Sequence, residues 1–134
     1  MKNIPVLAAK RLGIWATPPD TPLRAVANVL TEEDISSLVV VDDDQYLLGI
    51  ITRTDLLRAA LDRPNDWRDR PCGEWMTTNV VTVEPNASLQ TAAEKLREHC
   101  IHRVVVVERE NDRLRPIAVV SDGDIIYHLA KRSL

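Results

Sequence analysis

Two short stretches combine a hydroxyl group with a carboxylate three residues later, and both follow an apolar run. Thr52-Arg53-Thr54-Asp55 comes after Gly49–Ile51, and Ser121-Asp122-Gly123-Asp124 comes after Ala118–Val120. At a helix start this spacing forms a capping box, which satisfies backbone N–H groups without any ligand. A helix start also attracts anions, and a carboxylate can accept both hydroxyls of a ribose. Helix capping and ligand binding therefore both remain open.

These two stretches belong to two copies of one longer pattern. Gly13–Leu23 aligns with Asn79–Leu89, and after a short insertion in a polar turn Gly49–Leu56 aligns with Ala118–Ile125. A repeat with a single break in register indicates a duplication. We therefore expect each copy to fold as the same unit.

The pattern within each copy predicts the element order β-α-β-β-α. Short apolar strands are followed by helices whose apolar residues recur at helical spacing, then by two β-branched strands and a second helix. Asp20 or Thr21 is expected to cap the first helix and Asn86 its counterpart. The expected elements are strands 14–16, 38–41 and 47–51 with helices from 23 and over 54–61, and strands 80–83, 104–107 and 116–120 with helices from 89 and over 123–131.

One such unit cannot bury its sheet well alone, so two copies are expected to share a core. The predicted fold class is α/β (α+β), with two β-α-β-β-α repeats packed sheet to sheet about a pseudo-two-fold axis. Residues 1–61 are expected to hold an N-terminal segment and the first repeat, 62–71 a polar linker bracketed by prolines, and 72–134 the second repeat. The tetrapeptides Asp42–Gln45 and Arg109–Asp112 are expected to be hairpin loops.

Composition narrows the class of protein. The formal net charge of −3 provides no overall attraction to DNA or anionic membranes. Cys72 and Cys100 lack CxxC spacing, which favours reduced thiols. The apolar run at residues 4–9 is too short for a signal peptide or a membrane span, so a cytoplasmic location is expected. No nucleophile–base pair is evident, so no enzymatic activity is expected.

Four motifs in order, present in both copies, resemble the cystathionine-β-synthase (CBS) domain family, whose paired repeats are called Bateman modules. The resemblance covers roughly Gly13 to Leu129. Its clearest markers are the opening Trp75-Met76-Thr77-Thr78-Asn79-Val80-Val81-Thr82-Val83, the strand Ile101-His102-Arg103-Val104-Val105-Val106-Val107, and the Thr/Ser-x-x-Asp endings. The first copy departs at Trp15, Ala16 and Ser36-Ser37, which makes the two ligand clefts unequal.

The resemblance implies two clefts in which Asp binds a ribose, Thr or Ser lies near a phosphate, and first-strand residues surround an adenine. Arg53 and Arg103, with His102, favour a phosphorylated adenosine nucleotide in cleft one. Asp122 would repel a phosphate, so cleft two is expected to be empty or to take S-adenosylmethionine, with Trp15 stacking on a base or plugging the cleft. Cleft one comprises Thr52, Arg53, Asp55, Val80, Val81, Thr82, His102 and Arg103, and cleft two Ile14, Trp15, Ala16, Ser36, Ser37, Ser121, Asp122 and Asp124.

The resemblance therefore implies a non-catalytic regulatory module that binds an adenosine-type ligand (AMP, ADP, ATP, S-adenosylmethionine or NAD) and signals to a partner protein. A homodimer is expected, with no metal, no membrane partner and no cofactor beyond that ligand. Two rivals remain open. One is a structural or protein-interaction module with vestigial clefts, and the other is a metal-ion binder using His99, Cys100 and His102, or a nucleic-acid binder.

Overall fold

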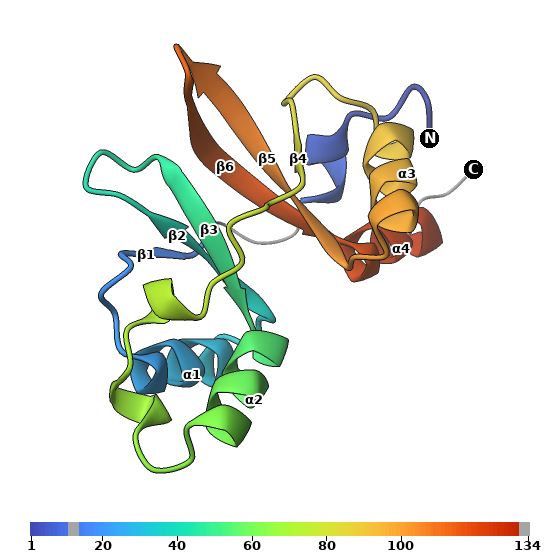
Figure 1. Cartoon of the computed structure of the whole chain (residues 1–134). Coiled ribbons are helices and arrows are strands. Elements are labelled where there is room, and N and C mark those ends of the chain that lie inside the picture. Colours follow the sequence, from blue (N-terminus) through green and yellow to red (C-terminus); the bar gives the residue numbers. More distant parts are fainter. Residues whose placement is uncertain (11–13, 132–134) are drawn as a thin grey trace. The chain divides into compact units, whose positions relative to one another are not determined.

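The protein's structure is a computed structural model that describes residues 1–10 and 14–131. The chain divides into two compact units. The first-repeat unit is Trp15–Val80, and the second-repeat unit combines Met1–Ile14 with Val81–Leu134. Each contains one three-stranded sheet and two α-helices, which confirms the predicted α+β class (Figure 1).

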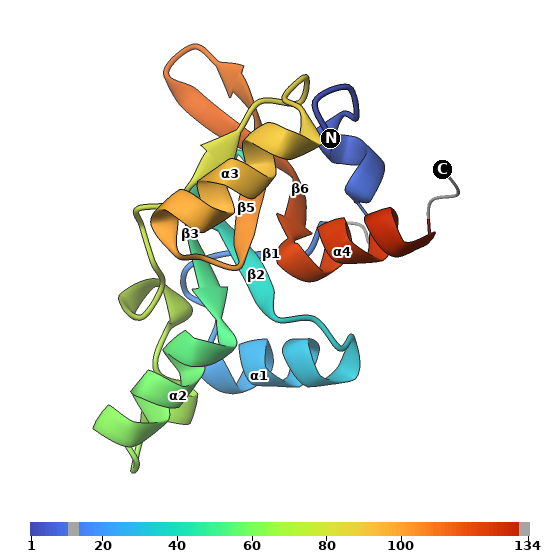
Figure 2. The same ribbon diagram turned by 90° about the vertical axis from the view of Figure 1, so that its right-hand side faces the viewer.

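The first-repeat unit follows the predicted element order. Its strands are β1 (Ala16–Thr17), β2 (Ser37–Val41) and β3 (Leu47–Thr52), and its helices are α1 (Leu23–Glu32) and α2 (Arg53–Asp62). The parallel pairing of β1 with β2 and the antiparallel pairing of β2 with β3 give the sheet order β1-β2-β3. Helices α1 and α2 lie side by side (Figure 2).

The second-repeat unit repeats this topology. Its strands are β4 (Thr82–Val83), β5 (Arg103–Glu110) and β6 (Arg113–Ser121), and its helices are α3 (Leu89–His99) and α4 (Asp122–Lys131). The sheet order is β4-β5-β6, again with one parallel and one antiparallel pairing.

Both faces of the strands are buried. In the first-repeat unit Leu38 and Val40 join the core beneath α1 and α2, while Val39, which alternates with them, is also fully buried. Because successive side chains of a strand point to opposite faces, a run buried on both faces is apolar throughout, as the sequence is.

The segment before each repeat packs on the unit of the other repeat. Met1–Ala9, grouped with the first repeat by its position in the sequence, lies in the second-repeat unit beside α3 and α4 (Figure 1). The Leu89 N–H donates to the Ile4 carbonyl at 2.6 Å, and the Val6 side chain is fully buried. This segment therefore completes the second-repeat core.

Residues 62–80, which comprise the predicted linker and the start of the predicted second repeat, do the same for the first-repeat unit and are called the linker from here on. The Leu23 N–H donates to the Arg70 carbonyl at 2.9 Å, the Cys72 N–H donates to the Thr21 carbonyl at 2.8 Å, and the Cys72 side chain is fully buried. Burial raises the pKa of Cys72 to about 11, so its thiol stays protonated at neutral pH. Neither Cys72 nor the exposed Cys100 forms a disulfide.

The predicted caps of α1 and α3 are both wrong. α1 begins after Pro22 without a side-chain cap, because the linker carbonyl of Arg70 accepts from the first N–H group of the helix. Thr21 instead bonds the Thr17 hydroxyl at 2.6 Å. α3 is capped by Ser88, whose hydroxyl accepts from the Thr91 N–H at 3.1 Å, and not by Asn86.

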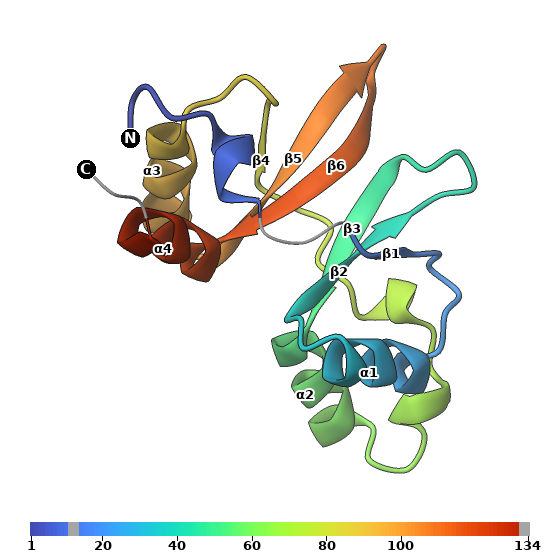
Figure 3. The same ribbon diagram turned by 180° about the vertical axis from the view of Figure 1, so that it is seen from behind.

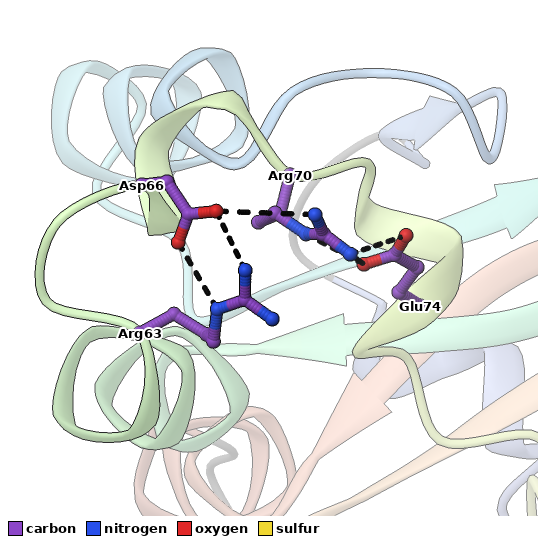
Figure 4. Close-up of polar contacts among 4 residues, drawn as sticks. All are labelled: Arg63, Asp66, Arg70 and Glu74. Carbon is purple, nitrogen blue, oxygen red and sulfur yellow. Dashed lines mark hydrogen bonds and ion pairs between the residues drawn. The ribbon is translucent and has the colours of Figure 1, made fainter.

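Ion pairs connect the linker internally. The Asp66 carboxylate accepts from Arg63 Nη2 at 2.7 Å and from Arg63 Nε at 3.1 Å, and Arg70 bonds Glu74 at 2.8 Å (Figure 4). The Arg63 hydrogen bond holds the pKa of Asp66 below its usual range. The predicted polar linker, residues 62–71, thus contains a short 3-10 turn, Trp67–Asp69, and a second turn, Cys72–Glu74, follows it.

The second hairpin is longer than expected. Arg109 and Glu110 continue β5 rather than forming a loop, and the turn consists of Asn111 and Asp112 only. Figure 3 shows the long hairpin of β5 and β6. Asn111 has φ of 59°, a left-handed conformation that asparagine tolerates better than most residues. The hairpin thus extends past its apolar run into charged residues.

Gly49 and Gly123 provide a matched test of packing in the two units. A Cβ at Gly49 would lie 2.7 Å from both Met76 Sδ and the Thr77 carbonyl oxygen, whereas a Cβ at Gly123 would lie 3.6 Å from its nearest neighbour, Ser121 Oγ. We expect Gly49→Ala to lower the free energy of unfolding by about 1–3 kcal/mol through this overlap. Gly123→Ala, within α4, should leave stability unchanged or raise it by up to about 1 kcal/mol. Urea denaturation checks both, and equal effects would contradict the packing described.

Candidate functional site

The start of α2 is a complete capping box. The Asp55 N–H donates to Thr52 Oγ1 at 3.3 Å, and the Thr52 N–H donates to Asp55 Oδ2 at 2.9 Å. The Thr52 hydroxyl is also 3.1 Å from Asp55 Oδ2. The carboxylate is thus fixed at the helix N-terminus, where a negative charge is stabilised by the helix dipole.

The start of α4 has the same arrangement. The Asp124 N–H donates to Ser121 Oγ at 3.0 Å, and the Ser121 N–H donates to Asp124 Oδ2 at 2.9 Å. The capping function predicted for both motifs is therefore formed in both units. Each places a hydroxyl and a carboxylate together at a helix N-terminus.

Each of these helix starts is hydrogen-bonded to the residue just before the first hairpin strand of its own unit, β2 or β5. The Arg53 N–H donates to the Ser36 carbonyl at 3.2 Å, and the Asp122 N–H donates to the His102 carbonyl at 2.8 Å. Arg53 is an exposed residue. Residues that the family resemblance assigns to different clefts are thus neighbours within a unit.

The ring of His102 reinforces this pairing. Its Nδ1 lies 3.1 Å from Asp122 Oδ2, and both side chains are exposed. The hydrogen bond to His102 holds the pKa of Asp122 below its usual range. The imidazole therefore faces a carboxylate of its own unit.

Strand register brings Arg103 next to the second hydroxyl–carboxylate pair. Arg103 on β5 lies directly opposite Ser121 on β6, just as Ser37 lies opposite Thr52 in the first-repeat unit. The Arg103 guanidinium and the Ser121 hydroxyl thus originate from paired backbone positions, and the Asp124 carboxylate follows three residues after Ser121. Serine occupies the corresponding position in the first-repeat unit, so the residue opposite the hydroxyl differs between the two units.

The remaining predicted residues lie on or beside the short first strands. Trp15 is 40% exposed and its carbonyl accepts from the Val39 N–H at 3.0 Å, while Ala16 is in β1. Val81 and Thr82 lie at β4 in the second-repeat unit, with the Val81 carbonyl accepting from the Val105 N–H at 3.1 Å. The predicted cleft residues are divided between the units, with Trp15, Ala16, Ser36, Ser37, Thr52, Arg53, Asp55 and Val80 in the first-repeat unit and Ile14, Val81, Thr82, His102, Arg103, Ser121, Asp122 and Asp124 in the second-repeat unit.

Two basic residues near these positions were missed from the sequence. Arg58 Nη2 donates to Asp55 Oδ1 at 3.2 Å, and Lys95 Nζ donates to the Thr82 carbonyl at 2.8 Å. The spacing of Asp55 and Arg58 on one helix face could have revealed the first. Nothing in the sequence indicates the second, because Lys95 and Thr82 meet only through the packing of α3 on the sheet.

The described residues contain neither a cluster of metal ligands nor a membrane-spanning helix. Within residues 1–10 and 14–131, no three His, Cys, Asp or Glu side chains converge in a way that could hold a metal ion. The helices of that same part of the chain are all too short or too polar to cross a membrane.

Comparison with known families agrees with the duplication. The CBS domain profile matches residues 13–62 and again residues 72–131. The chain belongs to the CBS domain family. The two matched stretches correspond to the two repeats recognised in the sequence.

Among CBS proteins, one similar relative is hypoxic response protein 1 of Mycobacterium tuberculosis, with 28% identity over 91% of this chain and 82% of that protein. The CBS domain-containing protein YhcV of Bacillus subtilis is 25% identical over 80% of this chain and 72% of its own length. Inosine-5'-monophosphate dehydrogenase of Aquifex aeolicus is 29% identical, but the chain spans only 20% of that enzyme.

Solved CBS structures share the fold. The CBS domain pair of protein MJ0100, in complex with 5'-methylthioadenosine and S-adenosyl-L-methionine, has a TM-score of 0.82 and 25% identity, covering 96% of this chain and 98% of that one. CBSX2 in complex with AMP has a TM-score of 0.81 at 20% identity, covering 96% and 98%, a likeness that supports the fold alone.

Substitutions of Thr52 and Thr54 distinguish the loss of a helix cap from the loss of an exposed threonine side chain. We expect Thr52→Ala to lower the free energy of unfolding by about 1–2 kcal/mol, because it removes the side-chain acceptor of the capping box. Thr54→Ala, an exposed position on the first turn of the same helix, should change it by less than about 0.5 kcal/mol. Thermal and urea unfolding of both variants measure the difference, and an equally mild effect of Thr52→Ala would argue against the capping box.

Proposed function

We propose that this CBS pair is a non-catalytic regulatory module that binds an adenosine-type ligand and transmits its binding to a partner protein. The observation that carries the proposal is the equivalent placement of Thr52 with Asp55 and Ser121 with Asp124 at two helix N-termini. The MJ0100 pair, similar over nearly its whole length, is described with two adenosine-type ligands.

In this proposal each carboxylate accepts ribose hydroxyls and each neighbouring hydroxyl lies near the 5' substituent. The first-strand residues, Trp15 and Ala16 in one copy and Val81 and Thr82 in the other, surround the adenine. Arg53 and Arg103 supply positive charge for a phosphate, and Asp122 favours a neutral or positively charged substituent near it. AMP, ADP, ATP, NAD and S-adenosylmethionine are therefore the ligand classes to compare.

The regulatory assignment follows from the kind of chemistry the helix starts can perform. A capped carboxylate and hydroxyl can bind and orient a ligand, because the capping hydrogen bonds hold both groups at the helix N-terminus. We therefore place the protein among ligand sensors and expect it to act in the cytoplasm on a protein not yet identified.

Ligand binding is tested by thermal shift and isothermal titration with AMP, ATP, NADH, 5'-methylthioadenosine and S-adenosylmethionine. A ligand at a hundredfold excess over its Kd should stabilise the fold by about 2.7 kcal/mol. Asp55→Asn and Asp124→Asn should each weaken binding about tenfold or more, since each loses a charge-assisted acceptor.

Asp66→Asn is the matched control, because Asp66 is a carboxylate of the linker ion pairs and not of a helix start. Its affinity should equal that of the unmodified protein. If none of the ligands stabilises the fold, the hydroxyl–carboxylate pairs serve as caps only, and the protein is a structural or protein-interaction module.

We further propose that the protein is a homodimer that associates through its exposed helix faces. Leu57 and Leu61 on α2 are 66% and 79% exposed, and Ile126 on α4 is 64% exposed. Each helix pair also has an apolar groove, of about 490 Å³ between α1 and α2 and about 510 Å³ between α3 and α4. A second copy would remove these apolar side chains from water.

Association is measured by sedimentation. Leu57→Glu combined with Ile126→Glu should convert the dimer to a monomer, because a buried charge without a partner opposes association. Asn65→Glu, an exposed linker position, should leave the dimer intact. A monomeric unmodified protein, or a dimer that survives the double substitution, would refute this interface.

A further inference from the structure

The Asp55 carboxylate already has three hydrogen-bond donors within its own unit. Oδ2 faces both the backbone N–H and the hydroxyl of Thr52, at 2.9 and 3.1 Å, and Oδ1 accepts from Arg58 at 3.2 Å. Asp55 is only 6% exposed. Its hydrogen-bonding capacity is therefore largely used before any ligand arrives.

Arg58 is held in this position by a second group. Its Nη2 also donates to the Trp75 carbonyl at 2.9 Å, and its guanidinium lies 5.5 Å from the centre of the Trp75 ring. The Trp75 ring packs against the first-repeat core. The linker thus fixes Arg58 over the carboxylate, while 53% of the Arg58 side chain remains exposed to solvent.

An ionised carboxylate offers about four acceptor sites, two on each oxygen. Thr52 occupies both sites of Oδ2 and Arg58 occupies one site of Oδ1. Only one site remains for a ligand, whereas a ribose diol donates two hydrogen bonds. Asp55 cannot accept both ribose hydroxyls while Arg58 stays in place.

We propose that Arg58 is a specificity-determining residue that competes with the ribose diol for Asp55. With Arg58 in place, the carboxylate accepts one hydroxyl and discriminates weakly between a ribose and a deoxyribose. Displacement of Arg58 opens the second acceptor site. Because the Trp75 carbonyl holds Arg58, the discrimination between ribose and deoxyribose depends on where the linker places Trp75. The inference rests on the proposed adenosine-type ligand and goes beyond it by naming what limits recognition of the sugar.

The test compares adenosine with 2',3'-dideoxyadenosine, which lacks both hydroxyls and, like adenosine, carries no phosphate that could attract Arg58. An Asp124→Asn background weakens the other proposed site, so that the titration reports on Asp55. The measured quantity is the dissociation constant of 2',3'-dideoxyadenosine divided by that of adenosine. We expect Arg58→Met, which keeps an apolar stem for Trp75, to raise this ratio about three- to tenfold through a second charge-assisted hydrogen bond.

Arg63→Met is the matched control, since it removes another ion-paired arginine of the same unit, and it should leave the ratio unchanged. Arg58→Gln, which retains an amide donor for the Trp75 carbonyl, repeats the test should the methionine variant be unstable. A folded Arg58 variant with an unchanged or smaller ratio would overturn the proposal, even if adenosine binds well. Failure of adenosine to bind the unmodified protein would instead overturn the proposed function itself, and this inference with it.

Discussion

The structure depends on the exchange of leading segments between the two repeats. Val6 precedes the first repeat but is buried in the second-repeat core, and Cys72 begins the predicted second repeat but is buried in the first-repeat core. Neither repeat contains its whole core within its own stretch of sequence. This exchange also supplies main-chain carbonyls to the first N–H groups of α1 and α3. A duplicated pair is therefore the smallest complete folding unit of this chain.

The linker that completes the first-repeat core is also connected, through Arg58, to the Asp55 carboxylate of the proposed binding site. Within a few residues it buries Cys72, packs Trp75 on the core and offers the Trp75 carbonyl to Arg58. Through Arg58 it contacts Asp55, at the start of α2. A ligand that competes for Asp55 would thus alter a contact with the segment that joins the repeats. A binding event can be transmitted only through such a contact, whose energy differs between the two states.

Helix capping and the proposed ligand recognition would use the same atoms at the starts of α2 and α4. The Thr52 hydroxyl and the Asp55 carboxylate form a capping box without any ligand, so the proposed site would be preorganised rather than assembled on binding. Preorganisation lowers the entropic cost of binding, but it also occupies acceptor sites. This balance explains why the motif alone does not distinguish a structural cap from a binding site.

Much of the fold was predictable because apolar periodicity and repetition are local in sequence. The stripe of Leu23, Val26 and Leu30 predicted α1, and the uninterrupted β-branched runs predicted strands buried on both faces. The capping boxes were also predictable from the Thr/Ser-x-x-Asp spacing. The predicted helix caps were wrong for two different reasons. The Arg70 carbonyl, from a distant segment, takes the place of a side-chain cap on α1, whereas α3 is capped by the adjacent Ser88 rather than by Asn86.

The sequence by itself determined the duplication, the β-α-β-β-α order and the two hydroxyl–carboxylate pairs. Only the tertiary structure decided which groups surround those pairs. Strand register places Arg103 opposite Ser121, and His102 faces Asp122 across the same unit. The carbonyl of Trp75, in the linker and seventeen residues after Arg58, holds Arg58 against Asp55. Such contacts join residues far apart in sequence, so no local pattern specifies them; they follow from how the strands pair and where the linker packs.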